Sequence, residues 1–180
     1  MEPATNVLIT GASSGIGAET ARTLAERGLR VFGTSRRARA PSPDEHGVHW
    51  LALDVTDDAS VAKAVARMRE ASGAIDAVVC NAGFGLFGSV EETPIEAAQR
   101  QFDTNYFGVL RVLRAVLPAM RERGRGRAVL VGSLAGRAPI PFQSHYSSTK
   151  AAVDALALAL RNEVGPLGIG VSLVEPGDIA

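Results

Sequence analysis

A tyrosine and a lysine one helical turn apart carry the clearest chemistry in this sequence. Tyr146 and Lys150 are four residues apart, and Ser133 precedes the tyrosine by thirteen residues. Residues at i and i+4 share one face of a helix, so the lysine ammonium can lie beside the phenol and favour its ionised form. This arrangement would let a tyrosine donate and accept a proton near neutral pH.

One lysine is not expected to be enough for this purpose. A free phenol has a pKa of about 10, and each unit of downward shift requires roughly 1.4 kcal/mol of differential stabilisation. We therefore expect a second positive centre near Tyr146, and the N-terminal third of the chain indicates what it is.

The composition favours one buried domain with a small partner. The chain has 180 residues, 46% of them hydrophobic, which is long enough for one domain and short for two. Its 19 basic and 19 acidic residues cancel, so no global charge recruits nucleic acid or an anionic membrane surface. A single cysteine, Cys80, excludes an internal disulfide. The start lacks a secretory signal and no apolar run reaches membrane-spanning length, so we expect a soluble, cytoplasmic protein.

Short β-branched apolar runs alternate with longer segments of helical period. The short runs predict strands at Asn6–Thr10, Arg30–Thr34, His49–Leu53, Asp76–Cys80, Val129–Val131 and Ile169–Val174. The longer segments predict helices at Gly15–Arg27, Asp57–Ala71, Pro94–Asp103, Asn105–Arg123 and Tyr146–Val164. Strands that are apolar on both faces and separated by helices indicate a parallel sheet covered on both sides. We predict a single doubly wound α/β domain over residues 1–180.

Three segments break this alternation and are predicted to be surface loops: Arg36–Gly47, Gly83–Thr93 and Gly124–Arg127. Arginines recur at every second position around the third loop. They could bind phosphate, but a solvated helix end explains them better, because cations suit helix C-termini. These arginines are Arg121, Arg123, Arg125 and Arg127.

A glycine-rich turn, residues 10–17, connects the first predicted strand to the first helix. Gly11, Gly15 and Gly17 permit positive φ and leave room for a pyrophosphate to approach the backbone amides. The helix N-terminus adds a favourable dipole. Any tight connection can use glycine, but the place of this turn after the first strand favours nucleotide binding.

The spacing Gly-x-x-x-Gly-x-Gly differs from the Gly-x-Gly-x-x-Gly dinucleotide fingerprint, and with the residues that follow it resembles the short-chain dehydrogenase/reductase family. The other motif residues stand in order along the chain: Asp54-Val55, Asn81-Ala82-Gly83, Asn105, Ser133, Tyr146, Lys150 and Pro176-Gly177. The resemblance runs from residue 6 to residue 180. The segments 81–88 and 133–150 are most similar to the branch of 17β-hydroxysteroid and retinol dehydrogenases. The resemblance implies a Rossmann-like oxidoreductase that interconverts a ketone or aldehyde and an alcohol.

By this resemblance, residues from several strand ends would contact a nicotinamide cofactor. The pyrophosphate and its ribose would be surrounded by Gly11, Ser13, Ser14, Gly15, Ile16 and Gly17, and the adenine bordered by Asp54 and Val55. The rest of the cofactor would meet Asn81, Ala82, Gly83, Tyr146, Lys150, Pro176, Gly177 and Ile179. The alternative for Asn81-Ala82-Gly83 is an ordinary turn at a strand end. Cys80 is expected to be a buried hydrophobe and not a nucleophile.

The end of the second predicted strand favours NADP over NAD. An NAD-selective site ordinarily places an acid there to accept the adenosine ribose hydroxyls, but this chain has Ser35 and Arg36. A hydroxyl can donate to a 2′-phosphate, and a guanidinium can pair with its oxygens and stack over adenine. The alternative is that Arg36 and Arg37 only solvate a loop.

The resemblance also assigns catalytic roles. Tyr146 would be the general acid/base, and Lys150 would hold the nicotinamide ribose and favour the ionised phenol. Ser133 would hydrogen-bond the substrate oxygen, and Asn105 would hold a water that links Lys150 to solvent. Oxidised nicotinamide would be the second positive centre. No metal is expected.

The side chains expected to face the substrate are Phe84, Leu86, Phe87, Ile140, Phe142 and Gln143. They suggest a small apolar carbonyl compound or alcohol, but core or subunit contacts would explain them equally well. Arg137 could meet an acidic substrate or face water.

The length of the chain raises a second possibility. Related single-domain enzymes continue to roughly 250 residues, so we expect the chain to be C-terminally incomplete. By the resemblance, the missing part would hold a substrate lid, a seventh strand and much of the interface of a homo-oligomer. A non-catalytic dinucleotide-binding or sensor module remains the alternative to an enzyme.

Overall fold

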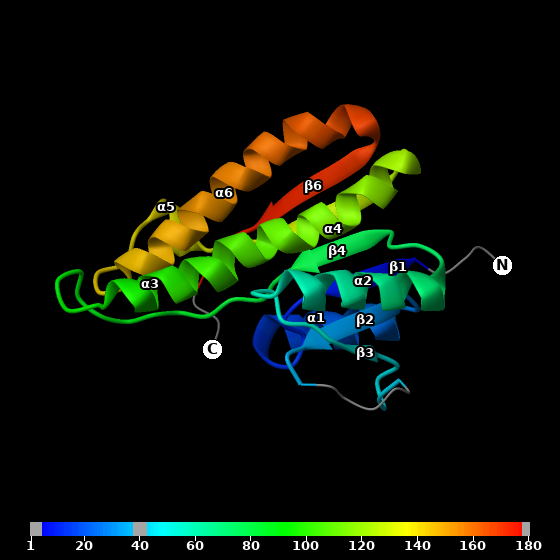
Figure 1. Cartoon of the computed structure of the whole chain (residues 1–180), viewed down its shortest axis with the longest axis horizontal. Helices are drawn as coiled ribbons and strands as arrows, with labels where there is room; N and C mark the ends of the chain where they lie inside the picture. The colour runs from blue at the N-terminus through cyan, green and yellow to red at the C-terminus, as the bar shows by residue number, and fades with distance from the viewer. Residues whose placement is uncertain (1–4, 38–42, 178–180) are drawn as a thin grey trace.

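The computed structural model describes residues 5–37 and 43–177. Its strands form one six-stranded sheet with helices packed against it (Figure 1). Its strands are β1 (Asn6–Ile9), β2 (Arg30–Ser35), β3 (His49–Ala52), β4 (Ala77–Cys80), β5 (Gly126–Val131) and β6 (Ile169–Val174). Every neighbouring pair is parallel, in the order β3-β2-β1-β4-β5-β6. The order runs outward in opposite directions from β1 and β4, so a crevice is expected at the carboxyl ends of these two strands.

Helices lie between β1 and β2, β3 and β4, β4 and β5, and β5 and β6. They are α1 (Gly15–Glu26), α2 (Asp58–Ser72), α3 (Ile95–Phe102), α4 (Gly108–Glu122), α5 (Leu134–Arg137) and α6 (Ser144–Val164). A π-helical turn, η1 (Asp103–Phe107), joins α3 to α4, and a 3₁₀ turn, η2 (Gly165–Leu167), follows α6. No helix among residues 5–37 and 43–177 is long and apolar enough to cross a membrane.

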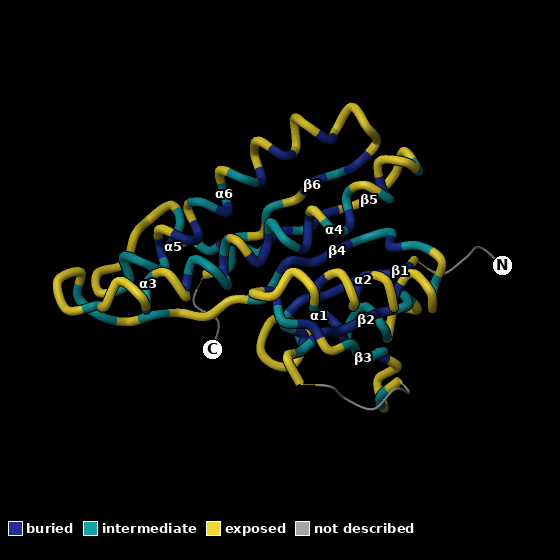
Figure 2. Tube along the Cα trace, in the orientation of Figure 1, coloured by how far each residue is buried: buried dark blue, intermediate teal, exposed yellow. Residues whose placement is uncertain are grey.

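Both faces of the sheet are buried, as the apolar strands predict. Leu8 packs into one core cluster, while its neighbours Val7 and Ile9 pack into the other. This alternation is the two-residue period of a strand. Side chains of α2, α4 and α6 fill the first cluster, and α1 covers the second. Figure 2 shows the central strands as the most deeply buried part of the chain. The predicted doubly wound α/β fold is confirmed.

Several predicted boundaries are wrong. The two helices predicted at Pro94–Asp103 and Asn105–Arg123 form one continuous helical stretch through η1. The fifth strand begins at Gly126, three residues before the predicted start, because Gly126 pairs with Ile169 of β6 and Arg127 with Ala77 of β4. The predicted loop Gly124–Arg127 is therefore partly strand. The four-residue helix α5 was not predicted, since it is too short to show a helical period.

The arginines near this loop are not all solvated, contrary to the prediction. Arg123 forms a 3.0 Å ion pair from Nη1 to Asp76 Oδ1 and also donates to the carbonyl oxygen of Ile75. The other carboxylate oxygen of Asp76 accepts from the backbone N–H of Asn6 at 2.9 Å. Arg123 thus joins the end of α4 to the starts of β1 and β4.

Candidate active site

The glycine turn is fastened to the end of β4, at the crevice between β1 and β4. Asn81 Nδ2 donates to the carbonyl oxygens of Thr10 at 3.0 Å and Gly11 at 3.1 Å. Thr10 Oγ1 accepts from the backbone N–H groups of Asn81 and Ala82, both at 3.0 Å. Asn81 therefore fastens the glycine turn to the chain after β4, and the contact of Asn81, Ala82 and Gly83 with a cofactor stays a prediction.

The three glycines of the turn are required for different reasons. A Cβ on Gly17 would lie 2.3 Å from the carbonyl oxygen of Gly11, and one on Gly11 would lie 2.8 Å from Cα of Ala82. Gly11 and Gly15 have φ of +66° and +55°. Nothing lies within 4 Å of a Cβ placed on Gly15. Packing therefore requires glycine at positions 11 and 17. At position 15 the space is open, and the positive φ is what favours glycine.

The start of α1 is suited to an anion. Ser14 is the N-cap residue but makes no side-chain hydrogen bond to the helix, and no acidic residue occupies the first turn. The amides of the first turn therefore remain available to a ligand. Together with the open space at Gly15, this geometry fits the diphosphate of a dinucleotide. Ile16 in the same turn is partly exposed, and Ser13 is exposed.

A cavity of about 630 Å³ adjoins the turn and is lined by Ser13, Ser35, Arg36 and Arg37. None of the described residues that line it is acidic. Ser35 Oγ donates to the carbonyl oxygen of Arg37 at 2.7 Å, which fixes the hydroxyl at the end of β2. The two guanidinium groups suit a phosphate better than a ribose diol.

The residues predicted to border the adenine lie at the end of β3. Hydrogen bonds from the backbone and side chain of Thr56 hold the pKa of Asp54 below its usual range, and the positive charges of Arg36 and Arg111 add to the effect. Val55 is buried, and its side chain packs where a Cβ on Gly108 would lie. The adenine contact of both residues stays a prediction.

Tyr146 and Lys150 lie together in the first half of α6. Lys150 Nζ is 5.6 Å from the centroid of the Tyr146 ring and donates a 2.8 Å hydrogen bond to the carbonyl oxygen of Val131. Only 6% of Lys150 is exposed. Burial lowers the pKa of the Lys150 ammonium from 10.5 to about 8, and the negative charge of Asp154 opposes this shift. The helix face predicted from the spacing is confirmed.

Ser133 is the N-cap of α5, two residues after the end of β5. Its Oγ accepts a 3.1 Å hydrogen bond from the backbone N–H of Ala135. The flanking backbone is tied to the chain after β6, because Gly132 N–H donates to Val174 O at 2.7 Å and Leu134 N–H to Pro176 O at 3.0 Å. These two backbone hydrogen bonds hold the Ser133 turn next to the Pro176-Gly177 segment. The predicted site residue Ile179 lies outside the described residues.

Asn105 lies in the π-helical turn and is 2% exposed. Its Oδ1 accepts from the backbone N–H of Phe84 at 3.0 Å, and its Nδ2 donates to Phe84 O at 3.0 Å and to Thr149 Oγ1 at 3.1 Å. Thr149 Oγ1 in turn donates to Tyr146 O at 2.8 Å. Asn105 therefore links the segment after β4 to α6 beside Lys150. Its predicted hold on a water stays a prediction.

Most of the predicted substrate-facing side chains are at the surface. Phe87 is 73% exposed and Phe142 68%, while Phe84 and Ile140 are also exposed. The N–H of Gly88 donates to Phe142 O at 2.9 Å, so the segments before α3 and before α6 are joined. Figure 2 shows these two segments largely in the colour of exposed residues. A role in the core is excluded for the four exposed side chains, whereas Leu86 and Gln143 are half-buried.

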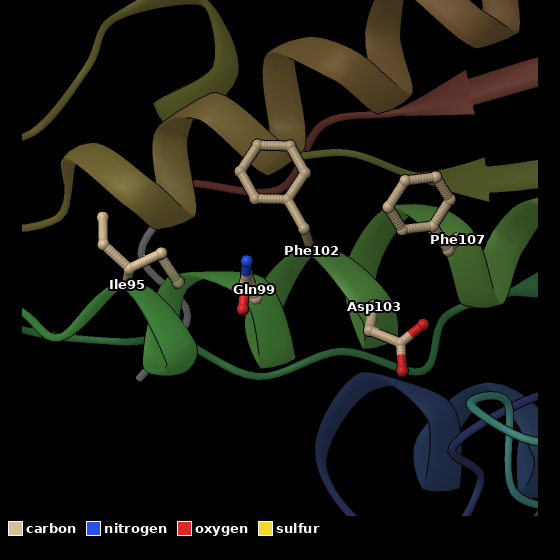
Figure 3. Close-up of a pocket in the computed structure, with 6 residues that line it drawn as sticks. Ile95, Gln99, Phe102, Asp103 and Phe107 are labelled. Carbon is tan, nitrogen blue, oxygen red and sulfur yellow. The ribbon is translucent and has the colours of Figure 1, made fainter.

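Another hollow, of about 470 Å³, contains none of the predicted site residues (Figure 3). It is lined by Ile95, Ala98, Gln99, Phe102, Asp103 and Phe107. All six come from the stretch of α3 and η1, and Ile95 and Phe107 are exposed. Its lining is mainly apolar, which does not fit a charged cofactor.

The sequence alone did not identify several residues that build the site. Gln101 is fully buried and donates from Nε2 to Phe84 O at 3.0 Å. Asp154 follows Lys150 by one helical turn, a spacing that could have pointed to it.

The structure also bears on other sequence predictions. Arg137, which was predicted either to meet an acidic substrate or to face water, forms a 2.5 Å ion pair with Glu175. Cys80 is buried, which raises the pKa of its thiol to about 12, as expected of a hydrophobe. Among the described residues, no group of histidine, cysteine, aspartate and glutamate side chains could hold a metal ion.

Comparison with known proteins agrees with this geometry. The family model for short chain dehydrogenases matches residues 5–180. The chain is 44% identical over 172 residues to 3-ketodihydrosphingosine reductase of Bacteroides thetaiotaomicron, covering 96% of this chain and 63% of the relative. It is 38% identical over 188 residues to human 17-beta-hydroxysteroid dehydrogenase type 1, covering 97% and 57%. The chain therefore spans less than two thirds of the length of these relatives.

Solved structures show the same fold. A short-chain dehydrogenase from Streptomyces avermitilis superposes with a TM-score of 0.94 at 38% identity, over 100% of this chain and 68% of that one. NADP-bound ElxO gives a TM-score of 0.92 at 31% identity, over 98% and 75%. NAD+-bound xylitol dehydrogenase gives 0.90 at 28%, over 98% and 72%. Both nicotinamide cofactors thus occur among similar structures, and the comparison does not distinguish between them.

Proposed function

We propose that this chain, which belongs to the short-chain dehydrogenase family, is an NADP(H)-dependent oxidoreductase that interconverts a ketone or aldehyde and an alcohol. One observation carries the proposal above all. A buried lysine lies beside the half-buried Tyr146 on the same helix face, at the end of the sheet that carries the glycine turn. The combination supplies an anion cradle and a proton-transfer group at one edge of the sheet.

The chain would supply orientation and proton transfer. When bound, the nicotinamide cofactor accepts or provides the hydride. In the direction of reduction, the Tyr146 hydroxyl would donate its proton to the substrate oxygen, and the nearby Lys150 ammonium would stabilise the phenolate that remains. The Ser133 hydroxyl would hydrogen-bond the same oxygen as negative charge develops on it. In oxidation these residues would act in reverse.

NADP(H) is the cofactor that we propose, on the strength of the cavity at the end of β2. Arg36 and Arg37 place positive charge there and Ser13 adds a hydroxyl group, and none of the lining residues that the structure describes carries a carboxylate. A 2′-phosphate would be attracted by these cations, whereas the diol of NAD would lack a carboxylate partner.

The proposed substrate is a small apolar carbonyl compound or alcohol. The exposed side chains of Phe84, Phe87 and Phe142 near the candidate site support this choice. As a protein partner we propose a second copy of the chain, because the apolar hollow on α3 offers exposed surface at Ile95 and Phe107. We keep the cytoplasm as the proposed location.

The experiment follows NADPH absorbance with a panel of ketones and aldehydes, with NADH in parallel. It uses this chain and, where the gene continues, the longer protein. We expect turnover of at least one apolar carbonyl compound with a preference for NADPH. Tight NADPH binding without turnover of any compound by the longer protein would overturn the proposal and favour a dinucleotide-binding module.

A further inference from the structure

A carboxyl group lies directly behind Lys150. Asp154 follows it by one turn of α6, and its buried Oδ1 atom accepts no hydrogen bond from any residue that the structure describes. A Cβ on Gly132 would lie 2.6 Å from Asp154 Oδ1, and a Cβ on Gly136 would lie 2.6 Å from Oδ2. Two glycines on either side of Ser133 thus leave space that the Asp154 carboxyl fills.

A second carboxyl group adjoins the same space. The Cβ on Gly132 would also lie 3.4 Å from Cγ of Glu175, which follows β6, and the charge and hydrogen bonding of Glu175 act on Asp154. Glu175 Oε1 also accepts a 2.5 Å hydrogen bond from Arg137 Nε of α5, and only 16% of its side chain is exposed. Two carboxylates cannot form a hydrogen bond with each other unless one of them carries a proton.

The charges around Asp154 come from three elements. Burial raises the pKa of Asp154, and the negative charge of Glu175 and its hydrogen bond act in the same direction. The positive charges of Arg137 on α5 and Lys150 on α6 oppose them. Gly132 and Gly136 bring no charge. Of the two carboxyl groups, Asp154 is the one whose charge acts on Lys150.

We propose that Asp154 and Glu175 share one proton, and that this carboxyl pair positions the Ser133 turn and the Pro176-Gly177 segment against the helix that carries Tyr146 and Lys150. The pair joins α6 to the chain after β6, while the hydrogen bonds from Gly132 to Val174 and from Leu134 to Pro176 hold the turn to that same segment. The pair carries one negative charge, which is divided between the two carboxyl groups. The part on Asp154 favours the protonated form of Lys150. The catalytic meaning of this arrangement rests on the proposed function, but the shared proton does not.

Two isosteric variants move the charge in opposite directions. In Asp154→Asn the amide takes the place of the protonated carboxyl, so the negative charge moves to Glu175, away from Lys150. In Glu175→Gln the charge is confined to Asp154, beside Lys150. The first variant should therefore lower the pH at which Lys150 loses its proton, and the second should raise it, each by roughly half a unit to one unit. A purely structural role would not produce opposite shifts.

Infrared difference spectroscopy of the cofactor-free chain tests the shared proton. We expect the absorption of a protonated carboxyl group near neutral pH in the wild type, and its loss in both variants. Glu163→Gln, which changes an exposed carboxylate near the end of α6, should leave the absorption unchanged. Absence of the absorption in the wild type, or its persistence in both variants, would overturn the proposal.

NMR of chain labelled in its lysine side chains tests the effect on Lys150. Lys63 and Lys150 are the lysines of the chain, and Lys63→Arg assigns the two signals. Opposite shifts of the Lys150 titration in the two variants support the proposal, and shifts of the same sign or none contradict it. The alkaline limb of turnover should move with the NMR titration. If the NMR and infrared results hold while no carbonyl compound is turned over, the proposed function fails and the carboxyl pair stands.

Discussion

Lys150 reaches from α6 to the end of β5, where its Nζ donates a 2.8 Å hydrogen bond to the carbonyl oxygen of Val131. This bond fixes the ammonium at the sheet edge beside the Tyr146 ring. It also connects the helix that carries both groups to the strand that leads into Ser133. A change at Lys150 should therefore affect both chemistry and stability.

Removal of the Tyr146 hydroxyl should separate cofactor binding from turnover. Tyr146→Phe keeps the ring beside Lys150 but cannot transfer a proton, so kcat should fall by about 10² to 10⁴-fold. NADPH affinity, measured by fluorescence titration, should change little. The matched control is Tyr106→Phe, which removes the hydroxyl from the other tyrosine of the chain and should leave kcat within about twofold. If Tyr146→Phe kept more than a tenth of the turnover, Tyr146 would not be the general acid.

The buried Lys150 predicts a distinct pH dependence of stability. Its pKa is lowered from 10.5 to about 8, so between these values the folded state binds fewer protons than the unfolded state. The free energy of unfolding must therefore rise with pH in this window, and the cost of burying the cation is fully present below about pH 8.

Lys150→Met lacks this titration. The stability of the wild type relative to the variant should rise by at most roughly 3 kcal/mol from pH 8 to pH 10.5, as measured by urea denaturation of the cofactor-free chain. Lys63→Met, on the exposed side of α2, should show a flat difference. An equally flat difference for Lys150→Met would mean that Lys150 is not desolvated.

A carboxylate at the end of β2 should reverse the cofactor preference. Ser35→Asp places a negative charge in the cavity that Arg36 and Arg37 line, where it would repel a 2′-phosphate and could accept the ribose hydroxyls of NAD. NADPH affinity should fall by about tenfold or more, while NADH affinity should rise. Ser172→Asp, at an exposed position on β6 at the opposite edge of the sheet, serves as the control. Unchanged selectivity in Ser35→Asp would refute the proposed phosphate site.

Asn105 should matter for stability as well as for activity. Asn105→Ala removes the three hydrogen bonds of a buried side chain and leaves the backbone N–H and carbonyl groups of Phe84 without this partner. The free energy of unfolding should fall by about 2 to 4 kcal/mol. Asn162→Ala, at an exposed position on α6, should change it by no more than about 0.5 kcal/mol. A similarly small effect at position 105 would show that these bonds are replaced easily by water.

Much of the fold was predictable because strands and helices have local periods. The apolar runs around Leu8 and Val78 are buried on both faces, which is what a central parallel strand requires. Helix ends were harder to predict. The π-helical turn around Asn105 adds one residue to a turn without any change in composition, so the sequence suggested two helices where there is one continuous stretch.

The candidate site was predictable at positions where local sterics or helix geometry require a particular residue type. Gly17 has no room for a side chain, and the spacing of Tyr146 and Lys150 places them on one helix face. Arg137 was ambiguous, because its partner Glu175 lies 38 residues away in the sequence. Asp154 was missed, since an aspartate on a helix is ordinarily solvated.

The sequence by itself therefore determined the α/β alternation, the glycine turn and the pairing of Tyr146 with Lys150, because sterics and helical period act over a few residues. Only the tertiary structure decided which distant groups satisfy those residues. Lys150 meets Val131 across 19 residues, Asn105 meets Thr149 across 44, and Asn81 meets Thr10 across 71. These contacts arise because parallel strands bring their carboxyl ends to one edge of the sheet, and the buried polar groups there must find partners wherever the fold places them.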